Sequence, residues 1–303
     1  MNFSNPYILI HTAVFLWGFT AILGKLISLD SLNLVWHRML IASLAFAILN
    51  GAIGGAKKLP KKAILRLGGI GCIVALHWIS FYGSIKIYNS ASLTLACMGT
   101  SALFSSLIEP FVVGKKFQKS ELFIGLLSFV GIYIICLANP SQGSEADSTK
   151  YFWAIVVGLI GSFLAAVFTS LNKKYAGEYE TEVVSFIELS VGGLFLTLMI
   201  PFFSTERFVW IPSKIDFIYL LIMGIVCTNF TFNISLKALK QLSAFTANLS
   251  VNLEPVYGFI LAAIIFKEHQ LLNIYFYLGA FLILASVLVQ PIMSFFKSKE
   301  KIA

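Results

Sequence analysis

A glutamate, Glu254, lies about halfway along the apolar stretch 245–266 and is followed directly by Pro255. A charge near the bilayer centre costs about 2.5–3.5 kcal/mol on insertion scales, so a carboxylate kept there is a candidate functional group. Proline removes a backbone donor and frees a carbonyl one turn earlier, which would expose polar backbone beside the carboxylate and bend the helix. We expect Glu254 either to bind a proton or a cationic substrate group, or to join two helices through a neighbouring Asn or Lys.

Pairs of asparagines spaced by four residues occur in two apolar stretches. Asn248 and Asn252 precede Glu254, and Asn229 and Asn233 lie in the preceding stretch. Residues four apart share one face of a helix. Asn252 and Asn229 are therefore candidates for the substrate site. The alternative for Asn252 is a bridge between helices, and Asn229 is expected to face protein rather than lipid.

An imidazole and several aromatic rings lie together in the third apolar stretch. His77 is followed by Trp78, Phe81 and Tyr82, and His77 and Phe81 share a helix face. An aromatic wall with one imidazole suits a small amphipathic solute, because Trp and Tyr can also form hydrogen bonds in a pocket. The alternative is a neutral histidine bonded to a neighbouring helix. Trp17, in the first apolar stretch, is expected to line the same cavity or to pack between helices.

Two charged residues, Arg38 and Glu188, lie 150 residues apart in the second and seventh apolar stretches. Arg38 could bind a substrate carboxylate, or extend its head group to the membrane surface. Glu188 could pair with a lysine or join a cavity. Both are candidate substrate-binding residues.

The sequence predicts no enzyme, no cofactor and no metal site. It has no His-Glu-x-x-His pair, no pair of aspartates within an apolar stretch and no Gly-x-Ser-x-Gly motif. The four cysteines lie within apolar stretches without paired spacing, so neither a zinc site nor a disulfide framework is expected. These cysteines are Cys72, Cys97, Cys136 and Cys227.

The composition requires an apolar environment for the elements that position these residues. Of 303 residues, 58% are hydrophobic and 12% charged, about half the usual share of charge in soluble domains. Mean hydropathy is +0.87. Although the net charge is +8, the lysines form short clusters between apolar stretches, so nucleic acid is not an expected partner and a lipid bilayer is.

Ten stretches are long enough to span a bilayer as helices, which requires about 20 apolar residues. An all-α membrane protein of ten transmembrane helices follows. The expected spans are 7–25, 32–53, 63–85, 90–113, 121–138, 152–171, 183–203, 217–236, 245–266 and 271–292.

The distribution of basic residues sets the expected orientation. With both termini in the cytoplasm, 15 of the 22 Lys and Arg residues fall on the inner side. Positive charge accumulates in cytoplasmic loops, so both termini are predicted to be cytoplasmic. We expect a multi-pass protein of a bacterial inner membrane.

The polar segment 139–150 (NPSQGSEADSTK) divides the chain into two sets of five spans. Residues 15–25 (FLWGFTAILGK) match 163–173 (FLAAVFTSLNK) at an offset of 148, and Lys86 matches Lys240 at 154. Because five is odd, the second set must enter the membrane from the opposite side. Inverted repeats of this kind are typical of secondary transporters with a site at the repeat interface. We predict a first repeat at 1–138, a linker at 139–151, a second repeat at 152–292 and a basic cytoplasmic tail at 293–303.

Short motifs follow one another in order along the chain. They are Leu16-Trp17-Gly18 with Lys25, Trp36-His37-Arg38, Ser90-Ala91-Ser92-Leu93, Ser243-Ala244-Phe245 and Leu253-Glu254-Pro255. Their order and spacing over residues 7–292 resemble the EamA-like branch of the drug/metabolite transporter superfamily. The chain departs from that pattern at Ser101, where the repeat would place a proline, and at Gly114-Lys115, where the family commonly has Gly-Glu.

The resemblance implies two five-helix repeats around a central cavity that opens alternately to either side. We therefore expect a secondary transporter for small metabolites or amphipathic compounds, amino acids among them, that exports its substrate or couples transport to protons. The alternatives are a lipid-headgroup flippase of the same fold and, at a lower rank, an intramembrane enzyme. The sequence indicates neither which substrate is carried nor whether the protein is a monomer or a dimer.

Overall fold

The computed structural model describes residues 5–137, 145–203, 208–251, 253–270 and 272–300, and within these ranges every regular element is a helix. In chain order they are α1 (Pro6–Leu26), α2 (Ser31–Ile48), α3 (Ala52–Ala56), α4 (Lys61–Tyr88), α5 (Ala91–Met98), α6 (Ser101–Val113), α7 (Lys119–Leu137), α8 (Glu145–Tyr175), η1 (Ala176–Glu178), α9 (Thr181–Phe203), α10 (Lys214–Leu221), the π-helical η2 (Ile222–Phe230), α11 (Thr231–Leu239), α12 (Ala244–Val251), α13 (Glu254–Phe266), η3 (Glu268–Gln270) and α14 (Ile274–Glu300).

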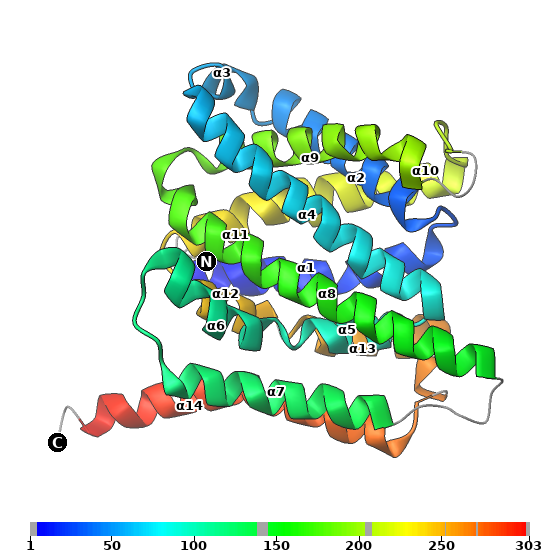
Figure 1. Ribbon diagram of the computed structural model, residues 1–303, viewed down its shortest axis with the longest axis vertical. Coiled ribbons are helices and arrows are strands. Elements are labelled where there is room, and N and C mark those ends of the chain that lie inside the picture. The colour runs from blue at the N-terminus through cyan, green and yellow to red at the C-terminus, as the bar shows by residue number, and fades with distance from the viewer. Residues whose placement is uncertain (1–4, 138–144, 204–207, 252, 271, 301–303) are drawn as a thin grey trace.

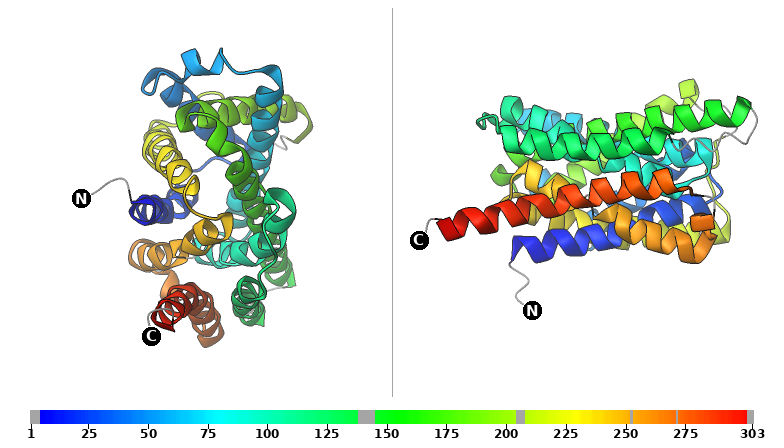
Figure 2. Two further views of the ribbon diagram at one scale, coloured as in Figure 1. Left: turned by 90° about the vertical axis from the view of Figure 1, so that its left-hand side faces the viewer. Right: turned by 90° about the horizontal axis from the view of Figure 1, so that it is seen from below.

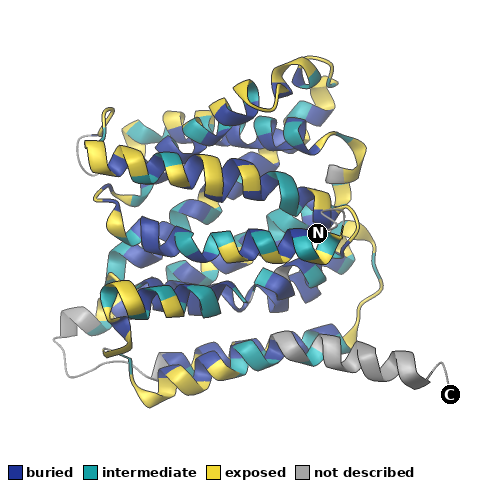
Figure 3. Ribbon diagram, turned by 180° about the vertical axis from the view of Figure 1, so that it is seen from behind, coloured by how far each residue is buried: buried dark blue, intermediate teal, exposed yellow. Residues whose placement is uncertain are grey.

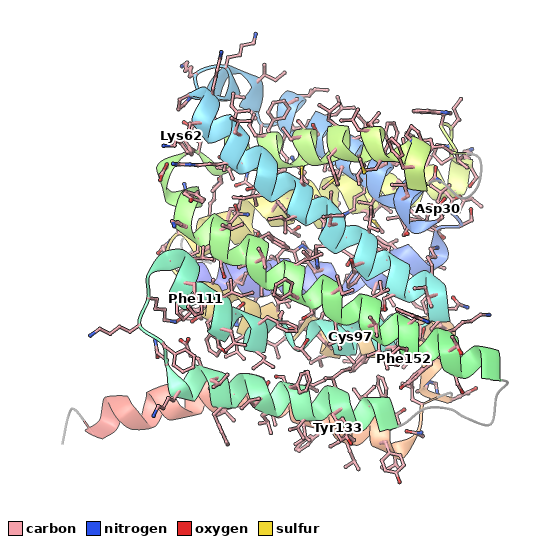
Figure 4. The ribbon with its side chains drawn as sticks, in the orientation of Figure 1. Asp30, Lys62, Cys97, Phe111, Tyr133 and Phe152 are labelled. Carbon is pink, nitrogen blue, oxygen red and sulfur yellow. The ribbon has the colours of Figure 1, made fainter. Side chains whose placement is uncertain are left out.

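The long helices lie side by side and run alternately in opposite directions (Figure 1). Three spans consist of consecutive pieces: α5 with α6, α10 through η2 with α11, and α12 with α13. Counted in this way, the described residues contain the ten spans predicted. Both termini lie at the same end of the bundle, here named the terminal end (Figures 1 and 2). Lys62 lies at the terminal end and Asp30 at the opposite end (Figure 4).

The two halves of the chain are inverted copies of one framework. α1 starts at the terminal end, whereas α8, the first span of the second half, starts at the opposite end (Figure 1). α5 and α12 begin 153 residues apart, and α6 and α13 do so as well. Gly114 and Lys267, which follow α6 and α13, are also 153 residues apart, and both adopt the left-handed conformation, with φ of 79° and 55°. The predicted fold class is confirmed.

The outer surface of the bundle is apolar. Phe111 is 88% exposed, and Tyr133 and Phe152 are each 60% exposed on the outside of the helices (Figure 4). Buried residues follow the inner faces, whereas exposed residues follow the outer faces and the loops (Figure 3). Eight of the spans meet the length and hydropathy of a membrane crossing. A bilayer requires helices whose backbone groups are hydrogen-bonded internally and whose outer surface consists of large apolar side chains.

The remaining two spans, α7 and α14, form a pair beside the rest of the bundle (Figure 1). Their backbones meet at Gly131 and Gly279. A Cβ placed on Gly279 would lie 2.3 Å from the carbonyl oxygen of Gly131. Small residues allow such close contact between helices in a membrane. This pair therefore supports the bundle from outside.

Candidate functional site

A cavity of about 110 Å³ lies in the centre of the bundle. One water needs roughly 10–15 Å³ on this measure, so the space holds several waters or a small solute. Residues from both halves of the chain line it. They are Ile10, Trp17, Thr20, Arg38, His77, Trp78, Phe81, Met98, Ser101, Ala165, Phe168, Thr169, Asn172, Phe232, Ser235, Leu236, Leu239, Ala247, Val251 and Glu254.

The cavity extends further toward the terminal end than toward the opposite end. On α11 its lining reaches Leu239, the last residue of that helix. On α1 and α4 it stops at Thr20 and Phe81, which at 1.5 Å per residue leaves roughly 9–11 Å of helix before the opposite end. Beyond these residues, Tyr82 and Ile85 are completely buried. The cavity is therefore sealed at the opposite end.

Arg38 is fixed at the cavity wall by three kinds of contact. Its Nε donates to Thr228 Oγ1 at 2.7 Å, and its two terminal nitrogens donate to the hydroxyl of Tyr82 and, at 3.4 Å, to the carbonyl oxygen of Cys227. The guanidinium lies 3.9 Å from the ring centre of Trp78. Such cation–π contacts contribute about 2 kcal/mol when desolvated. Arg38 has five N–H donors, so two remain beyond these contacts.

The π-helical η2 supplies the groups that hold Arg38. Thr228 Oγ1 donates to the carbonyl oxygen of Met223, five residues earlier, and Thr231 Oγ1 donates to that of Cys227, each at 2.8 Å. Trp17 Nε1 donates in turn to Thr231 Oγ1 at 2.9 Å. π-helical turns often occur at functional sites. Here the irregular turn presents a hydroxyl and a carbonyl to an arginine.

Glu254 is the first residue of α13 and is 6% exposed. Within the described parts of the chain its carboxylate has no hydrogen bond and no cation within 4 Å. Arg38 lines the same cavity from α2. The cavity therefore contains a carboxylate and a guanidinium that are not joined to each other.

The fourth and ninth spans are each broken where they pass the cavity. α6 begins at Ser101 and α13 at Glu254, so two helix N-termini meet the cavity. Pro255 lies in the first turn of α13, where proline is tolerated, and the expected bend is a complete break between two helices. The fourth span breaks without a proline. Ser101 Oγ is buried there and has no hydrogen-bond partner among the residues that the structure describes. Broken helices of this kind are typical of substrate sites in transporters.

His77 lies in the aromatic part of the wall. Its Nδ1 lies 2.8 Å from the carbonyl oxygen of Gly161. Because a carbonyl can only accept, Nδ1 carries the hydrogen, which leaves Nε2 as an acceptor in the neutral ring. The His77 ring lies 5.3 Å from Phe168 and 6.3 Å from Phe81.

The structure brings together five of the nine residues that the sequence suggested for the site: Trp17, Arg38, His77, Trp78 and Glu254. Tyr82 lies behind them, where it accepts from Arg38 and donates to Met223 Sδ at 3.4 Å.

The other suggested residues lie elsewhere. Asn229 is not part of the lining, and its amide donates to Asn50 Oδ1 at 2.9 Å. Glu188 is buried behind Asn172, whose Nδ2 donates to it at 3.3 Å. Asn252 lies outside the described residues.

Several lining residues were missed by the sequence reasoning, although the repeat contained a signal for them. At the offset of 148, Trp17 corresponds to Ala165 and Thr20 to Phe168, and all four line the cavity. Extending Trp17, a suggested residue, to its repeat counterpart would have identified Ala165. At the second offset of 154, Trp78 corresponds to Phe232, so the same extension would also have identified Phe232.

At the opposite end, a carboxylate caps the broken fourth span. Glu268 accepts from Ser92 Oγ at 2.6 Å and from the backbone N–H groups of Ala91 and Ser92 at 3.3 and 3.2 Å. It also forms an ion pair with Lys25 of α1 at 2.7 Å. Burial alone would raise the pKa of Glu268, but the hydrogen bonds from Lys25 and Ser92 outweigh it, and the pKa is lowered. Lys25 and Glu268 also line a separate hollow of about 320 Å³.

At the terminal end, a second carboxylate caps the broken ninth span. Glu109 of α6 accepts from the backbone N–H groups of Ala244 and Phe245 at 3.0 and 2.8 Å. Lys115 lies 3.7 Å from Glu109 and 2.6 Å from Glu121. Each half thus caps the broken helix of the other half.

Comparison with known proteins points to one group. Residues 4–137 and 152–290 match the family described as the EamA-like transporter family. An uncharacterized transporter of Archaeoglobus fulgidus is 27% identical over 271 residues, covering 86% of this chain and 88% of its own. The uncharacterized inner membrane transporter YicL of Salmonella typhimurium is 25% identical over 296 residues, covering 91% and 92%. A crystal structure at 17% identity shares the fold with a TM-score of 0.71, covering 95% of this chain and 96% of the other.

Proposed function

The chain belongs to the EamA-like transporter family, and on that premise we propose that it carries small amphipathic molecules with a carboxylate and a protonated amine. It is a multi-pass membrane transporter. We place it in a bacterial inner membrane with both termini in the cytoplasm, because the lysine-rich loops lie at the terminal end. The two repeats, 1–138 and 152–292, are proposed to move against each other around the cavity.

One observation carries this proposal: Arg38 and Glu254 line the same cavity without forming an ion pair. An isolated charge in a membrane interior is costly, so each group favours a partner of opposite charge. A zwitterion supplies both, with its carboxylate on the free N–H groups of Arg38 and its ammonium group on Glu254. A molecule with only a carboxylate or only an ammonium group would pair with only one of the two charged residues.

The rest of the lining supports an apolar or aromatic body for the solute. Trp17, Phe81, Phe168 and Phe232 surround the charged groups, and Ser101 offers a hydroxyl. Binding sites for small molecules are mostly apolar, with a few polar groups that fix orientation. An aromatic amino acid matches this combination in size and charge.

The difference between the two ends of the cavity supports transport by alternating access. The lining reaches the helix ends only at the terminal end, so this conformation is proposed to be the inward-facing one. Movement of one repeat against the other would close this end and open the other.

Three matched probes test the proposal in proteoliposomes: L-phenylalanine, phenethylamine, which lacks the carboxylate, and 3-phenylpropionate, which lacks the amine. We expect counterflow of L-phenylalanine in the wild type. Arg38→Gln should weaken L-phenylalanine binding by about 10- to 100-fold, equivalent to about 1.5–3 kcal/mol for a charged hydrogen bond, and leave phenethylamine unchanged. Glu254→Gln should weaken the binding of L-phenylalanine and of phenethylamine and leave the binding of 3-phenylpropionate unchanged.

The preference among probes does not depend on the amount of folded protein, so a loss of yield in Arg38→Gln does not obscure the result. The absence of counterflow and of thermal stabilisation with all three probes would overturn the proposed substrate class. Flux without counterflow would indicate a channel rather than a carrier.

A further inference from the structure

Behind the cavity, Glu188 of α9 meets Asn172 of α8. Glu188 is completely buried, and Asn172 Nδ2 donates to its Oε2 at 3.3 Å. Among the described residues, the other oxygen, Glu188 Oε1, has no hydrogen-bond partner, and Asn172 Oδ1 has none either. Ser185, three residues earlier on α9, also has a buried hydroxyl without a partner in this described part of the chain. Orphaned buried polar atoms are uncommon in folded proteins and call for a physical reason.

No positive charge compensates this carboxylate in the described parts of the chain. The charged side chains on the helices packed around α9 are bound to other groups or, like Lys61 and Lys62 at the start of α4, lie exposed, and α3 contains no titratable residue. Arg38 of α2 binds Thr228 and Tyr82, Lys237 of α11 pairs with Glu182, Lys173 of α8 donates to two backbone carbonyls, and, on α4, Arg66 lies over Tyr175 and His77 binds Gly161. α4 also carries the thiol of Cys72, and its backbone at Gly71 packs directly against that of Glu188.

One proton would satisfy both orphaned oxygens. In the ionised state Glu188 Oε1 and Asn172 Oδ1 are both acceptors, so neither can bond to the other. A proton on Oε1 makes it a donor to Oδ1, while Nδ2 continues to donate to Oε2. The result is a cyclic acid–amide pair with every polar atom used, whereas an unpaired buried carboxylate costs several kcal/mol.

We propose that Glu188 and Asn172 form a proton-binding site that couples transport to the proton gradient. This inference rests on the proposed function and extends it to the driving ion. Asn172 also lines the cavity, so a shift of its side chain on substrate binding opens the ring. The O–H bond of Glu188 then breaks, its proton passes to water in the cavity, and the carboxylate waits for a new proton in the next half of the cycle.

The test replaces Glu188 by Gln, which keeps the shape and the hydrogen bonds with Asn172 but cannot release a proton. Glu182→Gln is the matched control, because Glu182 lies on the same helix and is paired with Lys237 at 3.0 Å. In proteoliposomes, Glu188→Gln should keep counterflow of L-phenylalanine and lose its accumulation under an imposed proton gradient. Glu182→Gln should keep both activities.

A second measurement needs no substrate. Infrared spectra of the purified wild type at neutral pH should show the C=O band of a protonated carboxyl. Subtracting the spectrum of each variant should show that this band is lost in Glu188→Gln and kept in Glu182→Gln. The inference is overturned if this band does not change in Glu188→Gln, or if Glu188→Gln still accumulates L-phenylalanine under the gradient. If the wild type shows no counterflow, the proposed substrate class fails, and the infrared result still decides whether the proton site exists.

Discussion

The two ends of the central cavity use the same device and differ in how it is completed. Glu268 caps α5 at the opposite end, and Glu109 caps α12 at the terminal end. Lys25 of α1 bonds to Glu268 at 2.7 Å. Lys173, which matches Lys25 at the repeat offset of 148, does not take the equivalent place beside Glu109. It donates to the carbonyl oxygens of residues 239 and 240, at 2.9 and 3.4 Å.

This difference explains which end is sealed. At the opposite end the ion pair ties the first span to the broken fourth span, and the cavity stops short of it. At the terminal end the sixth span has no such tie to Glu109 in the described residues, and the cavity reaches the last residue of α11. Two inverted copies of one framework can thus adopt opposite states at the same time. Lys25 of the first span pairs with its capping glutamate, whereas its counterpart Lys173 of the sixth span does not, and this is the local sign of that asymmetry.

The largest expected effect comes from removing the carboxylate at the sealed end. Glu268→Ala leaves Lys25 partly buried without its partner and uncaps α5, so it should lower the free energy of unfolding by about 3–5 kcal/mol. Glu109→Ala removes a helix cap and the longer ion pair with Lys115 at 3.7 Å. Because Lys115 keeps Glu121 at 2.6 Å, no cation is left without a partner, and the cost should be about 0.5–2 kcal/mol. Denaturant unfolding in detergent compares the two variants. Equal losses would contradict the idea that only at the opposite end does an ion pair tie the capping glutamate to a neighbouring span.

Acid should weaken the sealed end. The pKa of Glu268 is lowered in the folded protein, so its contribution to stability is fully present above its ordinary value of 4.5. That contribution is lost as the pH falls through the lower, folded pKa. Melting temperatures measured from neutral pH into this acid range should therefore fall more steeply in the wild type than in Glu268→Gln. Parallel curves for the two proteins would show that Glu268 is not held ionised by its partners.

The fold could be predicted from the sequence because it depends on properties that are local and repeated. Apolar stretches of sufficient length gave the ten spans, and an odd number of spans per half required inversion. The break in the fourth span could not be predicted in the same way. The ninth span has Pro255 in the first turn after its break, whereas the fourth span breaks at Ser101 without a proline, so no residue type in the sequence marks that position as a break.

The site was predictable where chemistry made a residue conspicuous in an apolar stretch. Arg38, His77 and Glu254 stand out by type, and all three line the cavity. Asn229 stands out equally and instead bonds to Asn50. The helix face on which an asparagine lies depends on the π-helical turn in η2, which shifts the register of the residues after it. Nothing in the local sequence indicates that turn.

The smallest expected effect on stability is the most informative about the cycle. Lys173→Gln removes hydrogen bonds to two carbonyl groups and should cost about 0.5–1.5 kcal/mol, less than Lys25→Gln, which would leave the buried Glu268 without its cation. If Lys173 pairs with Glu109 when the terminal end closes, as Lys25 pairs with Glu268 now, Lys173→Gln should nevertheless slow counterflow of L-phenylalanine.

Lys174→Gln is the control for this last experiment, because Lys174 is the exposed neighbour of Lys173 and lies over the ring of Tyr175. It should change neither stability nor counterflow. A Lys173→Gln protein that is as stable and as fast as the Lys174→Gln protein would mean that the terminal end closes without an ion pair. The correspondence between the two ends would then hold for the helix caps alone. A Lys173→Gln protein that is stable but slow in counterflow would extend the correspondence to the lysine–glutamate ion pairs. A residue that contributes little to the stability of this conformation but is needed for exchange must act in the other conformation.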